Sequence, residues 1–72
     1  MELTYLQRKL WRLMSEDDRR SLRELCELTG VSSTSVINYN LHRLADKGVL
    51  IAPPPTHARS WRVKQAFTEN KP

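Results

Sequence analysis

The two glycines of this 72-residue chain, Gly30 and Gly48, enclose a segment whose apolar residues recur at helical spacing. On a helix this spacing places three side chains on one face: Ile37, Leu41 and Leu44. Glycine readily takes the positive φ angle that ends many helices, so we expect Gly48 to end this helix and Gly30 to end the helix before it. The sequence therefore predicts two helices joined by a tight turn after Gly30.

Capping patterns indicate where the helices begin. The spacing T-x-x-Q at residues 4–7 and S-x-x-E at residues 21–24 is that of a capping box, and Ser32 or Ser33 can cap the helix after Gly30. We expect a first helix from about Tyr5 to Met14. The apolar stripes of the first two helices are Leu3, Leu6, Leu10, Leu13 and Met14, followed by Leu22, Leu25, Cys26 and Leu28.

The last third of the chain has the pattern of a β-hairpin. Residues 49–52 and 61–63 form apolar or alternating runs, and the proline-rich segment 53–60 separates them. The predicted fold class is α+β, with three helices followed by a two-stranded hairpin. We assign residues 1–66 to one domain and 67–72 to a polar tail. Trp11 and Tyr5 lie off the first stripe, so they either pack under the C-terminal segment, against Val63, Ala66 and Phe67, or form a partner surface, and packing is favoured.

The charges are distributed unevenly along the chain. Residues 1–27 carry equal numbers of bases and acids, so the net charge of +4 comes entirely from residues 28–72. Between residues 28 and 45 there is no acidic side chain. A surface built from this half of the chain would attract a polyanion such as a nucleic acid.

Other features narrow the class of protein. The single cysteine, Cys26, cannot form an internal disulfide, which fits a cytoplasmic setting, and no Cys/His spacing resembles a zinc site. From the start of the sequence and its short apolar runs, we expect no signal peptide, no membrane span and no contact with membranes. Because His42 and His57 are isolated and no paired carboxylates or glycine-rich loop occur, we expect no catalytic site, metal or cofactor.

The helix after Gly30 has a polar outer face. With its apolar stripe turned inward, this face presents Thr34, Ser35, Val36, Asn38, Tyr39, His42 and Arg43. Such a helix fits the major groove of DNA, where Asn can pair with adenine, Ser and Thr can reach several bases, and Val can touch a thymine methyl. An ordinary solvated face, the alternative, would mix in Glu and Lys before residue 46. The pattern favours base reading over that alternative.

Two helices separated by Gly30 and Val31, with the small residue Cys26 four positions before the glycine, have the outline of a helix-turn-helix. Residues 30–50 also resemble the corresponding segment of the LexA repressor DNA-binding domain, through the run Leu44-Ala-Asp-Lys-Gly48-Val. More loosely, the chain resembles MarR-type and ArsR-type winged-helix regulators. The resemblance covers about residues 3–64 and implies a winged helix-turn-helix that binds double-stranded DNA, typically as a repressor of transcription.

The resemblance also implies which residues read the bases. By position these are Ser33, Ser35, Val36, Asn38 and Tyr39. The LexA family has acidic residues at the last two positions, so a different DNA sequence is expected here. The connection between the first two helices is shorter than in LexA, and prolines replace the glycines of the wing. The resemblance does not extend to the LexA protease domain, so it does not imply self-cleavage or the dimer contacts of that domain.

A second group of residues is expected to contact phosphates or to lie in the wing, the hairpin over about residues 49–63. These residues are Ser32, Thr34, His42, Arg43, Lys47, Arg59, Arg62 and Lys64. In the wing, Arg59 is the favoured contact, whereas a solvated loop is an equally good interpretation for His57. Alternation predicts that Trp61 belongs to the core.

Two questions stay open at the level of sequence. A winged helix can also serve as a protein-interaction or RNA-binding module, because fold does not fix function. Such a module would expose apolar anchors on the third helix, and only Val36 and Tyr39 qualify. A homodimer through the first helix or the tail is possible, because one copy of this size offers a single half-site.

Overall fold

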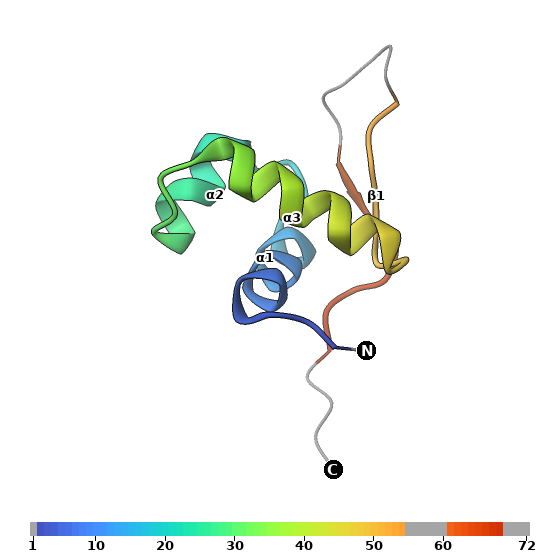
Figure 1. Ribbon diagram of the computed structural model, residues 1–72. Coiled ribbons are helices and arrows are strands. Elements are labelled where there is room, and N and C mark those ends of the chain that lie inside the picture. Colours follow the sequence, from blue (N-terminus) through green and yellow to red (C-terminus); the bar gives the residue numbers. More distant parts are fainter. Residues whose placement is uncertain (1, 55–60, 69–72) are drawn as a thin grey trace.

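The computed structural model describes residues 2–54 and 61–68. Three helices, α1 (Tyr5–Glu16), α2 (Leu22–Thr29) and α3 (Thr34–Asp46), precede two short strands, β1 (Leu50–Ile51) and β2 (Arg62–Val63), as Figure 1 shows. The strands pair antiparallel, with Leu50 opposite Val63 and Ile51 opposite Arg62. The predicted α+β class and the order of elements are confirmed.

The predicted caps form, with one exception. Thr4 Oγ1 accepts from the backbone N–H of Gln7 at 3.1 Å and Thr4 N–H donates to Gln7 Oε1 at 3.3 Å, so the first capping box is complete. Ser21 Oγ accepts from Glu24 N–H at 3.0 Å, but the Glu24 carboxylate binds Arg20 instead of completing the second box. These contacts fix the starts of α1 and α2 close to where the sequence predicts them.

The third helix begins and ends as expected. Of the two candidate serines, Ser33 is the cap: its hydroxyl accepts from Val36 N–H at 3.3 Å. Gly30 and Gly48 have φ angles of 79° and 85°, the left-handed conformation that only glycine adopts at little cost. The turn between α2 and α3 therefore has the geometry that Gly30 predicts.

Two element boundaries differ from the predictions. α1 extends past Met14 to Glu16, where the Arg20 guanidinium binds both the Leu13 carbonyl at 3.2 Å and the Glu16 carboxylate at 3.4 Å. The strands are shorter than predicted because the carbonyl of Val49 accepts from both Lys64 and Gln65 N–H, which ends the regular pairing there. At the other end, Pro53 has no N–H to donate.

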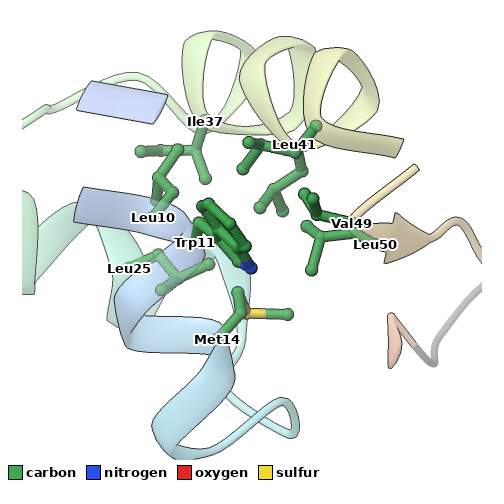
Figure 2. Close-up of a cluster of buried hydrophobic side chains, with 9 residues drawn as sticks. Leu10, Trp11, Met14, Leu25, Ile37, Leu41, Val49 and Leu50 are labelled. Carbon is green, nitrogen blue, oxygen red and sulfur yellow. The ribbon is translucent and has the colours of Figure 1, made fainter. Parts of the chain in front are cut away.

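One core joins all the helices to the sheet. Its fully or nearly buried side chains are Leu10, Trp11, Met14, Leu25, Ile37, Leu41, Leu44, Val49 and Leu50. Figure 2 shows these side chains converging from α1, α2, α3 and β1. The predicted inner stripe of α3 is confirmed, whereas Leu28, predicted on the α2 stripe, is exposed because α2 turns mainly Leu25 into the core.

Trp11 is buried although it lies off the predicted stripe. Its indole N–H donates to the Gln65 carbonyl at 2.7 Å, and its ring meets Phe67 edge-to-face with centroids 5.0 Å apart. Packing under the C-terminal segment is therefore confirmed for Trp11. It is wrong for Tyr5, which is 78% exposed.

The charged connection between α1 and α2 holds the C-terminal segment. Asp18 Oδ2 accepts from the backbone N–H of Val63 at 3.2 Å. Just before the connection, Ser15 Oγ accepts from Phe67 N–H at 2.8 Å. These bonds anchor β2 and the residues after it against α1.

Candidate nucleic-acid interface

The outer face of α3 is polar and open to solvent. Among the predicted base-reading residues, Ser35, Val36 and Tyr39 are exposed, Tyr39 at 62% and Val36 at 42%, and Asn38 is half-buried. Thr34, His42 and Arg43 are exposed on the same helix. In Figure 1, α3 lies across α1, with α2 near its start and the two strands near its end. The helix thus presents an outer face that is open to solvent, with Trp61 in contact only at His42 near its end.

Ser33, also among the predicted base-reading residues, lies at the cap of α3. It is half-buried, and its hydroxyl oxygen accepts the hydrogen bond that caps α3. This bond uses one of the two acceptor sites of the hydroxyl, which can still donate one hydrogen bond and accept another. Ser32, which precedes the cap, is exposed and lies outside the helix. The two serines therefore lie at the start of α3, where backbone N–H groups and the helix dipole favour an anion.

The basic residues around α3 lack carboxylate partners in the described chain. Arg43 is exposed in the last turn of α3, half-buried Lys47 caps the helix, and Arg62 and Lys64 are exposed on and after β2. All the ion pairs among the described residues lie elsewhere, between Glu16 and Glu24. These four cations are consequently available to an anionic ligand.

His42 and Trp61 connect α3 to the strands. Their rings meet edge-to-face, with centroids 4.9 Å apart and planes at 74°. Trp61 is half-buried and packs against the core, as predicted, and β2 alternates as expected, with Trp61 and Val63 inward and Arg62 and Lys64 outward. His42, expected to contact phosphates, is thus also a packing partner of the sheet. The candidate wing residues His57 and Arg59 lie outside the described residues.

Asn40 is the residue of α3 that sequence reasoning missed. Its amide donates to the Val36 carbonyl at 2.8 Å, and its Oδ1 accepts from Gln7 Nε2 at 3.0 Å. Gln7 is the only buried polar residue among those that the structure describes. A usable signal exists in the sequence, because Gln7 and Asn40 each flank an apolar stripe, where a polar side chain needs a partner.

We found no arrangement typical of a metal or membrane site in residues 2–54 and 61–68. These residues contain no group of three or more His, Cys, Asp or Glu side chains that could hold a metal ion. Among the same residues, no helix is both long and apolar enough to cross a membrane. Cys26 is a free thiol, half-buried against the core.

Comparisons with protein-family models, curated proteins and solved structures found no match to this chain. The function is therefore inferred from the geometry and charge of α3 and its surroundings.

Proposed function

We propose that this chain is a winged helix-turn-helix domain that binds double-stranded DNA, with the outer face of α3 in the major groove. The observation that carries the proposal is the exposed, polar outer face of α3, in a stretch without acidic residues from 28 to 45. It is bordered by four cations without carboxylate partners among the described residues: Arg43, Lys47, Arg62 and Lys64. A helix of this width fits the groove, and cations at its border suit the phosphates.

The roles within this interface divide by chemistry. Asn38 and Ser35 offer hydrogen-bonding groups to base edges, and Val36 and Tyr39 offer apolar contact, for example to a thymine methyl. Ser32, at the start of α3, and the four cations contact the backbone and set the position of the helix. The His42–Trp61 contact holds α3 against the sheet. In this arrangement the β1–β2 hairpin serves as the wing and lies beside the duplex.

The resemblance of residues 3–64 to the LexA DNA-binding domain supports the same proposal and suggests a repressor of transcription. A bound domain of this size can repress by occupying a site that another protein needs. The DNA sequence would differ from that of LexA, because Asn38 and Tyr39 replace acidic residues.

A second function, as a protein-interaction module, is favoured by one observation. Val36 and Tyr39 are three positions apart on α3, so they lie side by side, and both are exposed. Together they could anchor a partner. The scarcity of other apolar residues on this face makes DNA binding the stronger proposal.

Fluorescence anisotropy with a labelled random-sequence duplex tests the proposal. We expect the chain to bind the duplex saturably. The double substitution Arg43→Ala/Lys47→Ala should weaken this binding by about tenfold, because each substitution removes a phosphate contact. Arg23→Ala, which removes an exposed cation from α2, serves as the matched control and should bind as the wild type does. The proposal would be contradicted if Arg23→Ala weakened DNA binding as much as the double substitution does. It would also be contradicted if the chain bound single-stranded RNA of the same length more tightly than the duplex.

A further inference from the structure

A second cationic surface covers the outside of α1. Arg8 and Arg12 are exposed and Lys9 is half-buried, and none of them pairs with a carboxylate in the part of the chain that the structure describes. The Lys9 ammonium lies 5.9 Å from the centre of the Tyr5 ring. This differs from the situation in the α1–α2 connection, where Arg19 and Arg20 are both ion-paired.

These cations surround a shallow pocket with aromatic walls. Its lining residues are Tyr5, Arg8, Lys9, Arg12 and Phe67, and we call it the α1 pocket. Phe67 is fixed in place, because its ring packs on Trp11 and its backbone N–H donates to Ser15 Oγ. The pocket thus has one wall held by the fold and one, Tyr5, that is 78% exposed.

The α1 pocket lies apart from the outer face of α3. α1 turns Leu10 into the core and Gln7 toward Asn40 of α3, and helical spacing places Arg8 and Arg12 on the other side of α1. Figure 1 shows α1 on one side of α3, so the solvent-facing side of α1 points away from α3. A ligand in the α1 pocket therefore leaves the outer face of α3 free.

We propose that the α1 pocket binds an acidic segment of a partner protein, one that carries an apolar or aromatic residue among its carboxylates. Two properties of the pocket match these two features: Arg8, Lys9 and Arg12 attract carboxylates, and the Tyr5 and Phe67 rings bury an apolar side chain. The phosphate backbone of DNA lacks the apolar group that the rings would cover. A second copy of this chain fits poorly, because each copy has a net charge of +4 and two facing α1 surfaces would repel.

The probe is a short labelled peptide of Asp and Glu residues around a single phenylalanine, titrated with the full chain in the absence of DNA. We expect binding that Arg8→Glu/Arg12→Glu weakens by about tenfold or more, because two attractive charges become repulsive. Arg23→Glu is the matched control, since it reverses an exposed cation on α2 and should have a much smaller effect. A peptide with serine in place of phenylalanine should bind several-fold more weakly, and Tyr5→Ala should reduce that difference.

Three results would overturn the proposal. In the first, the serine and phenylalanine peptides bind equally well, or Arg23→Glu weakens peptide binding as much as the α1 substitutions do. Either result would show that the peptide is attracted by net charge alone. In the second, the α1 substitutions weaken duplex DNA binding as strongly as Arg43→Ala/Lys47→Ala, which would make α1 a phosphate contact. In the third, the wild type self-associates in sedimentation velocity and Arg8→Glu/Arg12→Glu does not. Because the peptide titration contains no DNA, its outcome is independent of DNA binding by α3.

Discussion

Gln7 of α1 and Asn40 of α3 are joined by a hydrogen bond of 3.0 Å between Gln7 Nε2 and Asn40 Oδ1. Gln7 also completes the capping box with Thr4, and Asn40 also donates to the Val36 carbonyl on α3. The start of α1 is thereby connected to the first half of α3, which carries the candidate base-reading residues. This connection holds the orientation of α3 on the rest of the domain.

Removing one partner of this bond should destabilise the fold. Asn40→Ala leaves the buried Gln7 amide without its acceptor, and we expect a loss of about 1–3 kcal/mol in the free energy of unfolding. For a domain of this size, each kcal/mol corresponds to about 4–8 °C in Tm. Thermal unfolding followed by circular dichroism measures the change, and Ser35→Ala on the exposed face is the control. Equal Tm values for the two variants would show that the Gln7–Asn40 bond contributes nothing.

The hydrogen bond between Trp11 and Gln65 leads to a separate prediction. Trp11→Phe removes the hydrogen bond to the Gln65 carbonyl and leaves a smaller ring in the core, so we expect a loss of about 1–3 kcal/mol. Tyr5→Phe, on the exposed side of the same helix, should have almost no effect. Urea denaturation gives both values. An unchanged midpoint for Trp11→Phe would mean that the C-terminal segment does not depend on this contact.

Asp17 should contribute to the pH dependence of stability. A hydrogen bond from the backbone N–H of Arg19, followed by one from its side chain, lowers the pKa of Asp17 below its ordinary value. Because the pKa is lowered in the folded state, ionised Asp17 stabilises the fold at pH values above its ordinary pKa. This stabilisation is lost as the pH falls through the folded-state pKa. Asp17→Asn should therefore lose less stability than the wild type on acidification below about pH 4. Urea midpoints measured across this range test the prediction, and parallel curves would refute it.

The four cations around α3 should determine how DNA affinity depends on salt. Replacing Arg43, Lys47, Arg62 or Lys64 singly by alanine should lower the slope of log affinity against log salt by about one, because each phosphate contact releases about one counterion. Arg23→Ala should leave the slope unchanged. The measurement is a series of anisotropy titrations at increasing salt. A wild-type affinity that does not depend on salt would argue against phosphate contacts at all four positions.

The features that the sequence predicts well are local. Caps at Thr4, Ser21 and Ser33 and the inner stripe of α3 depend on residues only a few positions apart, and the structure has them where the pattern places them. The positive φ angles of Gly30 and Gly48 were likewise predictable from local sequence. Short-range spacing was therefore enough to predict three helices and a hairpin.

Contacts between distant segments were not predictable in the same way. The burial of Trp11 depends on Gln65 and Phe67, more than fifty positions away, and Asn40 acquires its role from Gln7. Helical spacing alone does not predict which residues of the C-terminal segment pack against α1. Nor does it predict which of the polar side chains beside the apolar stripes form hydrogen bonds with each other. For the candidate site, the sequence predicted the outer face of α3 and offered Ser33 as one of two possible caps, but it did not predict that His42 would pack on Trp61.

The most direct test of DNA reading by α3 is selection of bound sequences from a random duplex library, carried out in parallel with the wild type, Asn38→Ala and Arg43→Ala. We predict that the wild type enriches a defined motif and that Asn38→Ala relaxes the preference at one base pair, since one base contact is worth about 1–3 kcal/mol. Arg43→Ala should bind more weakly with the same motif, and a palindromic motif would indicate two bound copies. If the wild type enriches no motif even at low salt, base reading by α3 is contradicted.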